Sequence, residues 1–463
     1  MPAVIDRHPR FPLLLLYSEP FIMRRFSFLF LPLLLVGLVL TGCDSTGSMS
    51  DDDGADQIEV PATYTFQSRF VEGESAVAYP GQVTRNLLIS DIKALTDQRA
   101  GTPTRDDLFN RYEYDAQNLN ILLSTDPAPA QSVYPDIATG KSLSGKATAS
   151  YSDVALIGVG DLANFSSGAT ADVVIRAYLD SIATNYADGE TAPEAYTTAE
   201  GVDMGQIVNK LLLGAVAYSQ GTAKYLEDVL TQQASPNTQD GQKPYSTMGH
   251  VWDEAYGYYG AARDFSESGV FYDANGLVSK ADDRNGDGEI DLESEVVFTW
   301  ADYSVDRGTV NGINFHIDLF ESFREGRTAI INQASIDSIR AHAADARSTW
   351  DDLVASNVVH YLNAMESDVA GLSDSDTVTR AALGSDGAES FNEHWGEAKP
   401  FAWALQYNPD KKISDSELES LHQILGGAPP YGKTKAEVVQ DINDAKALIK
   451  GAYQFPDANM NNW

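Results

Sequence analysis

Residues 204–230 read MGQIVNKLLLGAVAYSQGTAKYLEDVL and decide the fold class of this chain. Their apolar side chains recur every three or four residues, the spacing that places them on one face of an α-helix. The segment 173–182 has the same spacing, and no strand alternation of comparable length occurs in the sequence. The sequence therefore predicts a mainly α protein. Further helical stretches are expected near 247–264, 313–333, 336–369, 391–407, 415–425 and 435–453.

Three of the expected C-terminal helices begin with a hydroxyl residue that is followed three positions later by glutamate. In such a capping box, the hydroxyl and the carboxylate each accept a hydrogen bond from a backbone N–H group that the helix leaves unpaired. These starts favour a helical bundle for the C-terminal half. The pairs are Ser390 with Glu393, Ser414 with Glu417, and Thr434 with Glu437.

The first hundred residues of the folded part have a different character. Residues 61–160 are rich in Pro, Ser and Gly, which favour turns and loops. Within them we expect one short strand at 64–70 and one helix at 83–96. The predicted fold is therefore a helical bundle with a loop-rich N-terminal portion.

The charge of the chain excludes one class of partner. The 463 residues include 32 Lys and Arg against 67 Asp and Glu, which gives a formal net charge of -35. A protein that binds nucleic acid needs a basic surface to neutralise phosphates, and no basic stripe appears along the chain. Hydrophobic residues make up 43% of the sequence, enough to form a core. We therefore expect a folded acidic protein that binds no nucleic acid.

The only cysteine, Cys43, ends a pattern typical of protein export. Residues 23–43 read MRRFSFLFLPLLLVGLVLTGC, with two arginines, a long apolar run and small residues before the cysteine. The last four residues resemble a bacterial lipobox, in which the cysteine becomes the first mature residue and carries the lipid. We therefore expect translation to start at Met23, residues 1–42 to be removed, and Cys43 to be lipidated.

The alternative is an uncleaved membrane anchor. The apolar run is short for a membrane-spanning helix and contains Pro32 and Gly37, which disfavours that alternative. Beyond the cysteine, the rest of segment 43–60 contains Ser, Gly and Asp and few apolar residues, which is typical of a flexible acidic tether. The sequence therefore predicts an exported protein that a lipid anchors to the membrane of the cell envelope, on the periplasmic face or at the cell surface.

Two segments place a histidine three or four residues before a glutamate. The first reads GHVWDEAYGY over 249–258, and the second reads EHWGEAKPF over 393–401. Residues so spaced lie on one helical face, and helical bundles that bind metals present His and Glu from facing helices. Imidazole and carboxylate ligands suit iron or zinc. The alternative is a hydrogen-bonded polar network inside a bundle. The expected ligands are His250, Glu254, His394 and Glu397, with Asp253 and Glu393 as secondary candidates.

An acidic insertion at 265–312 separates two of the expected helices. Its segment DRNGDGEID, residues 283–291, matches the first nine positions of a calcium loop, with oxygen donors at alternate positions and a glycine for the turn. Ser294 stands where a bidentate glutamate is usual, so a neighbouring acid would have to close the loop. The alternative is a solvated acidic turn. The expected calcium ligands are Asp283, Asn285, Asp287, Glu289, Asp291 and Glu295.

Four segments resemble those of a family of bacterial lipoproteins that carry a domain of unknown function, of the DUF 4856 type. The most specific is GQKPYSTMGHVWDEAYGYYG, residues 241–260, and the resemblance extends over 61–463. The other segments are PATYTF, GQVTRNLL and FNEHWGEAKPFAWALQYNP.

This family is more distantly similar to imelysin-type proteins. Those proteins are helical, located in the envelope, regulated by iron and built from two related bundles around a Gly-x-His-x-x-Glu motif. The resemblance implies an imelysin-like fold of two related bundles. The chain departs from the motif, because Gly249 is adjacent to His250 and Asp253 stands at the glutamate position.

These observations leave three classes of function open. The first is an envelope lipoprotein that binds a transition metal through the paired His/Glu helices, for uptake or sensing. The second is a noncatalytic surface or periplasmic interaction protein in which the same residues hold the bundle together. An enzyme comes third, because the sequence contains no His-Glu-x-x-His, Gly-x-Ser-x-Gly, phosphate-loop or Rossmann signature, and no catalytic residue is assigned.

Overall fold

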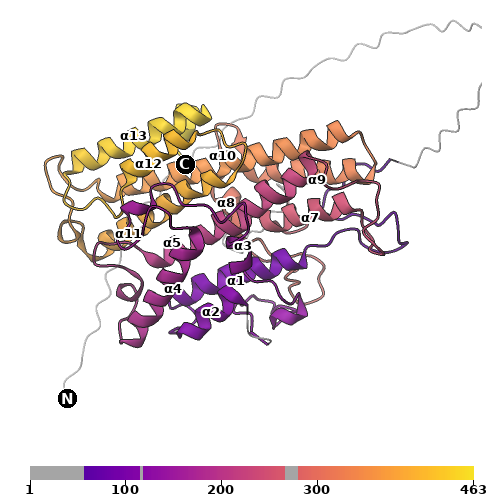
Figure 1. The fold of residues 1–463 in the computed structure, drawn as a ribbon, viewed down its shortest axis with the longest axis horizontal. Helices are drawn as coiled ribbons and strands as arrows, with labels where there is room; N and C mark the ends of the chain where they lie inside the picture. The colour runs from indigo at the N-terminus through magenta and orange to yellow at the C-terminus, as the bar shows by residue number, and fades with distance from the viewer. Residues whose placement is uncertain (1–56, 115–117, 266–279) are drawn as a thin grey trace, which may run out of the picture. The chain divides into compact units, whose positions relative to one another are not determined.

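Helices account for almost all regular structure in the computed structural model, which describes residues 57–114, 118–265 and 280–463 (Figure 1). Within these residues, the only strands longer than an isolated bridge are β1 (Thr309–Val310) and β2 (Ile313–Asn314), which pair as an antiparallel hairpin. The prediction of a mainly α fold is confirmed.

The described residues belong to one compact unit, Ala55–Trp463. The predicted export signal, Met23 and Cys43 lie outside the described residues, as does the tether up to residue 56. No helix among the described residues is both long enough and apolar enough to span a membrane.

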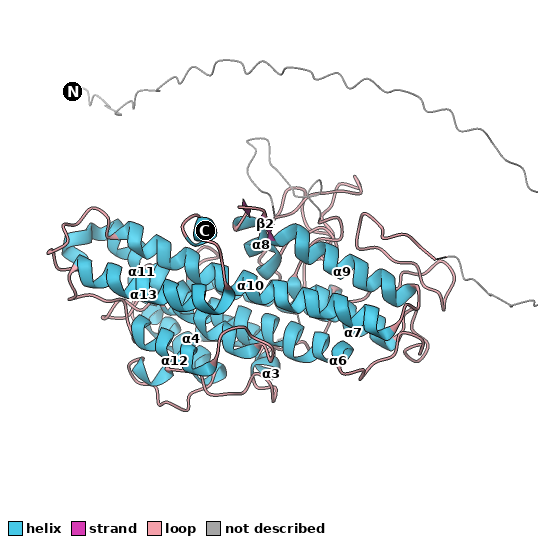
Figure 2. Ribbon diagram, turned by 90° about the horizontal axis from the view of Figure 1, so that it is seen from above, coloured by secondary structure: helices cyan, strands magenta, loops and turns pink. Residues whose placement is uncertain are grey.

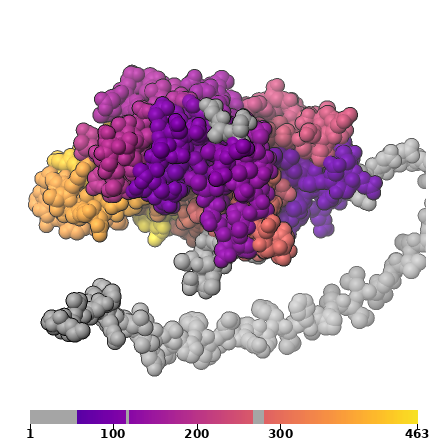
Figure 3. All heavy atoms as spheres, turned by 90° about the horizontal axis from the view of Figure 1, so that it is seen from below, coloured from indigo at the N-terminus to yellow at the C-terminus, as the bar shows by residue number. Residues whose placement is uncertain are grey.

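Loops make up much of the N-terminal portion, as predicted, and this portion forms a large part of the face seen in Figure 3. Its first helix coincides with the one expected at 83–96 and begins with a proline, which suits the first helical turn. Its helices are α1 (Pro80–Thr96), α2 (Arg105–Glu113) and α3 (Ser144–Ala147), with 3₁₀ turns at Tyr134–Asp136 and Val159–Asp161. The next helix is α4 (Ala171–Ala187), which is followed by a 3₁₀ turn at Glu194–Tyr196.

The prediction of a strand at 64–70 is wrong. Only Gln67 pairs there, as an isolated antiparallel bridge with Ser75. Tyr64 and Phe66 are buried for another reason, because the ring of Tyr64 stacks on that of Tyr256 with centroids 3.6 Å apart. The alternation of this segment reflects packing against a helix rather than membership of a sheet.

The segment 204–230 is helical throughout, but its centre is wound more widely than an α-helix. It consists of α5 (Met204–Leu212), two π-helical stretches (Leu213–Tyr218 and Gln220–Leu226) and α6 (Glu227–Leu230).

Two glycines of this segment allow close packing. A Cβ atom at Gly221 would lie 2.6 Å from the ring of Trp350, and one at Gly214 would lie 3.0 Å from Ala404. Larger residues at these positions would push the neighbouring helices apart.

The longest helix of the described residues, α10 (Ile336–Asp368), organises the bundle. It packs against α9 (Phe315–Ile331) over one part of its length and against α11 (Arg380–Ala404) and α13 (Lys435–Tyr453) over another (Figure 2). The buried ring of Trp350 on α10 contacts four other buried rings, which form an aromatic cluster in the core. These are the rings of Tyr218, Tyr259, Trp300 and Phe323. The remaining helices are α7 (Thr247–Tyr259), α8 (Thr299–Asp306), α12 (Asp415–Leu425) and α14 (Asp457–Met460), with a 3₁₀ turn at Leu405–Tyr407.

Two of the three predicted capping boxes are confirmed. Ser414 and Thr434 cap α12 and α13, and the glutamates at 417 and 437 complete both boxes. The prediction of a capping box at Ser390 is wrong, because this residue lies inside α11. Thr379 already caps that helix, and the chain stays helical past a kink at Gly384, where φ is 78°. Hydroxyl and glutamate at this spacing therefore need a free helix end to act as a cap.

Candidate functional site

The aspartate of the first histidine motif forms a buried ion pair. The Asp253 Oδ1 atom lies 2.8 Å from Nε of Arg327, and their side chains are 0% and 1% exposed. The hydroxyl of Tyr64 donates to the same oxygen at 2.8 Å, and the backbone N–H of Ala78 donates to Oδ2. Charged groups removed from water require such partners. Asp253 therefore joins α7, α9 and the N-terminal segment.

The other two polar residues of this motif have different surroundings. The imidazole of His250 stacks on the ring of Tyr245, with centroids 4.6 Å apart, and its Nδ1 is buried without a hydrogen-bond partner among the described residues. Glu254 accepts hydrogen bonds from Gln82 at 3.0 Å and from Tyr225 at 3.3 Å. The two side chains thus contact separate neighbours.

The glutamate of the second motif also forms a buried ion pair. The Lys210 Nζ atom lies 2.9 Å from Oε1 of Glu397, and their side chains are 4% and 8% exposed. Lys210 also donates to Gln206 and Asn209, so all three of its N–H bonds have acceptors. Burial lowers the pKa of Lys210, but the charge and hydrogen bond of Glu397, together with the nearby Tyr361 and Glu393, raise it more. This pair ties α11 to α5.

The histidine of the second motif is bound to a residue outside the motif. The Nδ1 atom of His394 lies 2.7 Å from Oδ2 of Asp368. Burial lowers the pKa of this histidine, while the hydrogen bond and charge of Asp368 raise it more. The secondary candidate Glu393 accepts a hydrogen bond from Gln206 at 2.6 Å.

Three of the four predicted ligands of a transition metal, Glu254, His394 and Glu397, are therefore engaged with other side chains. Among the described residues, no three His, Cys, Asp or Glu side chains are grouped so that they could hold a metal ion. The carboxylate of Glu397 already pairs with Lys210, and the imidazole of His394 already pairs with Asp368. This arrangement does not fit a bound iron or zinc ion. Metal binding through these residues stays a prediction, which a measurement of metal content in solution can test.

The calcium-like loop is closed by Glu295. Its carboxylate accepts hydrogen bonds from the backbone N–H groups of Arg284, Asn285 and Asp291. The carboxylate of Asp283 accepts three more, from residues 286, 287 and 288. The loop is therefore folded around its own acidic side chains.

The backbone conformation of the rest of the loop fits the predicted calcium-loop pattern. Gly286 and Gly288 have φ of 74° and 90°, a conformation that suits glycine. Asn285 and Asp287 each accept a hydrogen bond from the backbone N–H two residues further on. Ile290 is buried and pairs with the backbone of 128–130. Calcium binding itself stays a prediction.

Sequence reasoning missed a buried lysine, Lys399, which lies two residues after Glu397. Its side chain is 0% exposed, and Nζ donates to the backbone oxygen of His422 at 3.2 Å. Burial lowers the pKa of Lys399 to about 7. The ring of His422 is buried beside it, with no hydrogen-bond partner for either nitrogen among the described residues. The signal in the sequence was a lysine between apolar residues of an expected helix.

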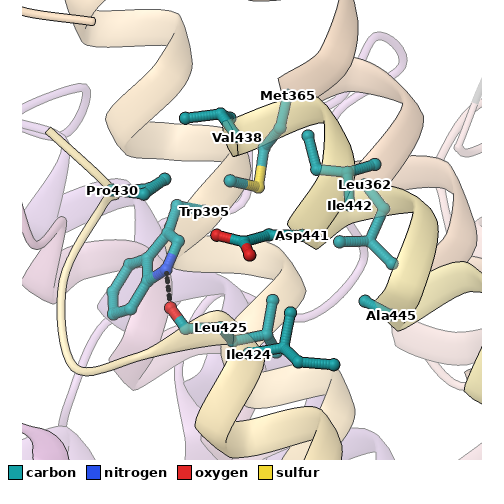
Figure 4. A pocket seen from close by; sticks show the side chains of 10 residues that line it. All are labelled: Leu362, Met365, Trp395, Ile424, Leu425, Pro430, Val438, Asp441, Ile442 and Ala445. Atoms are coloured by element: carbon teal, nitrogen blue, oxygen red, sulfur yellow. Dashed lines mark hydrogen bonds between the residues drawn. The ribbon is translucent and has the colours of Figure 1, made fainter. Parts of the chain in front are cut away.

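A pocket between α10, α11, α12 and α13 is too small to serve as a ligand site (Figure 4). Its free space is about 20 Å³, enough for one water molecule. Trp395 borders it and donates its indole N–H to the backbone oxygen of Leu425 at 2.9 Å. The carboxylate of Asp441 is the one charged group among its lining residues. We therefore assign no ligand to this pocket.

The fold and these contacts define a mainly helical protein whose histidine motifs take part in buried polar contacts between helices. The chain belongs to the family described as Domain of unknown function (DUF4856), whose model matches residues 61–385. Comparison with curated proteins and with solved structures gave no match. The imelysin-like relation therefore stays a prediction.

Proposed function

We propose that the protein is an exported lipoprotein of the cell envelope whose helical domain is a noncatalytic interaction protein. The support for the anchor is the lipobox that ends at Cys43. The acyl chains would have to hold the protein at the membrane, because a domain this acidic gains nothing from anionic lipid headgroups.

One observation carries the noncatalytic role: the motif residues make contacts between helices. Asp253 and Glu397 each form a buried ion pair with a basic residue of another helix. A metal or substrate would have to displace Arg327 or Lys210, and each would then remain as an uncompensated buried charge.

The segments that carry the family resemblance meet in these contacts. Tyr64 from PATYTF donates to Asp253, and Gln82 from GQVTRNLL donates to Glu254. In the same region, Asn86 donates to the backbone oxygen of Gly257 at 2.9 Å. A shared way of packing the helices explains these sequence signals without a catalytic centre.

Elemental analysis tests this proposal. The purified wild-type protein is compared with a His250→Ala/His394→Ala variant and with His342→Ala as a control. Within the described part of the chain, the one acidic partner of His342 is Glu325, at 3.6 Å. We expect equal iron and zinc content in all three proteins. About one equivalent of metal in the wild type and the control, lost in the double variant, would overturn the proposal and favour metal binding.

A further inference from the structure

A cleft of about 640 Å³ lies where several distant parts of the chain meet. It is lined by residues of α1, α5 and α8 and by the segments 122–124 and 296–299. Pockets that hold small organic molecules have volumes of about 300–1,000 Å³. The cleft therefore has room for a small organic ligand.

Part of the cleft wall is apolar. Leu122 and Leu123 line it from the N-terminal portion, and Val297 and Phe298 line it from the stretch before α8. Tyr303 adds an aromatic ring from α8 itself. Apolar walls with a few polar groups are typical of sites that bind the body of an organic molecule.

The charge of the cleft lining is opposite to that of the whole chain. Four basic residues line the cleft against two acidic ones, Asp91 and Asp302, whereas acidic residues outnumber basic ones about two to one in the full sequence. The four basic residues are Lys93, Arg99, Lys210 and Lys280.

Two of these cations are available to a ligand. The side chains of Arg99 and Lys280 are 64% and 65% exposed. Asp97 is shared between Arg99 and Lys93, at 3.0 and 2.5 Å, so one carboxylate serves two cations. Lys280 contacts Asp302. The acid of each pair is less exposed, at 19% for Asp97 and 18% for Asp302, so the acids stay in place. Arg99 has five N–H donors and Lys280 has three, which leaves donors for an anionic ligand beside the existing pairs.

We infer that this cleft binds a small organic anion with an apolar body. Its carboxylate, sulfate or phosphate group contacts Arg99 and Lys280, and its apolar body packs against Leu123, Val297 and Phe298. Such binding goes beyond the proposed interaction role and does not depend on it. It would make the domain a receptor for a small molecule.

The anionic dye 8-anilinonaphthalene-1-sulfonate is a suitable probe, because it combines a sulfonate with an aromatic body. The dye is titrated by fluorescence into the mature chain with Cys43→Ser, which carries no lipid. Arg99→Gln/Lys280→Gln removes the two exposed cations. Lys433→Gln/Lys450→Gln is the matched control, since both lysines are 46% exposed and paired with acids elsewhere. Circular dichroism checks that each variant is folded.

We expect saturable binding of about one dye per chain, with a Kd that rises about tenfold in Arg99→Gln/Lys280→Gln and stays unchanged in the control pair. Ala94→Phe, which narrows the cleft without changing charge, should also weaken binding. The neutral analogue N-phenyl-1-naphthylamine should be insensitive to the charge variant. Absence of saturable binding, or equal affinity in the two charge variants, would overturn the inference.

Discussion

The guanidinium of Arg327 lies 2.8 Å from the carboxylate of Asp253, at a point where neither side chain is reached by water. A third polar group, the hydroxyl of Tyr64, completes the network. The three residues come from α9, α7 and the segment that precedes α1. A buried pair of this kind fixes the relative position of its elements, because any other arrangement would leave a charge unpaired.

Replacement of one member of this pair should lower the free energy of unfolding more than replacement of both. We expect Asp253→Leu to lower the free energy of unfolding by about 3–5 kcal/mol, because Arg327 stays buried without a counter-charge. Asp253→Leu/Arg327→Met should cost less than the single change. Urea unfolding of the three proteins gives these values.

An exposed pair provides the control for this prediction. Asp337 and Arg340 lie 3.9 Å apart with 91% and 34% exposed side chains, and their replacement by alanine should cost less than about 1 kcal/mol. Equal effects at the buried and exposed pairs would contradict a role of Asp253 in holding the helices together.

Most helices could be predicted from the sequence because helix formation depends on neighbouring residues. The expected helix at 336–369 is α10, and those at 415–425 and 435–453 match α12 and α13. Apolar periodicity and capping residues are both local signals. The same local reading failed for 64–70, where a contact with Tyr256 decides the conformation.

The partners of the motif residues could not be predicted in the same way. Helical spacing shows which face a residue occupies, but not which side chain of another helix faces it. Lys210 lies far from Glu397 in the sequence and contacts it only in the folded chain. One signal was available, since Lys210 falls on the apolar face of segment 204–230, and a buried lysine requires a buried acid.

Calcium should stabilise the protein if the loop at 283–295 binds it. A calcium concentration about one hundred times the Kd would add about 2.7 kcal/mol to the free energy of unfolding. Asp287→Ala should abolish this gain, whereas Asp386→Ala, an exposed acid on α11, should leave it intact. Calorimetric titration and thermal unfolding measure both effects. The loop is only an acidic turn if calcium changes neither quantity.

Lipid attachment at Cys43 makes a separate prediction. Expressed with its own leader in a bacterium that processes lipoproteins, the wild-type chain should enter the membrane fraction and Cys43→Ser should not. Replacement of Ser48 by alanine gives a control in the same segment without removing the thiol. Mass spectrometry of the mature N-terminus would show a diacylated cysteine. Equal fractionation of wild type and Cys43→Ser would exclude lipid as the anchor.

Stability should depend on pH through Lys399, whose pKa burial lowers to about 7. The unfolded lysine titrates near 10.4, so between about pH 7 and pH 10 the unfolded chain binds more protons and the free energy of unfolding rises with pH. Below pH 7 both states are protonated, and the full cost of burying the charge remains. Lys399→Met should therefore be more stable than wild type at pH 6, by roughly 4–5 kcal/mol, with a difference that shrinks toward pH 10. Urea unfolding at four pH values measures the difference in stability between Lys399→Met and wild type. Replacement of the exposed Lys433 by methionine is the control. A difference between Lys399→Met and wild type that does not change with pH would contradict the prediction.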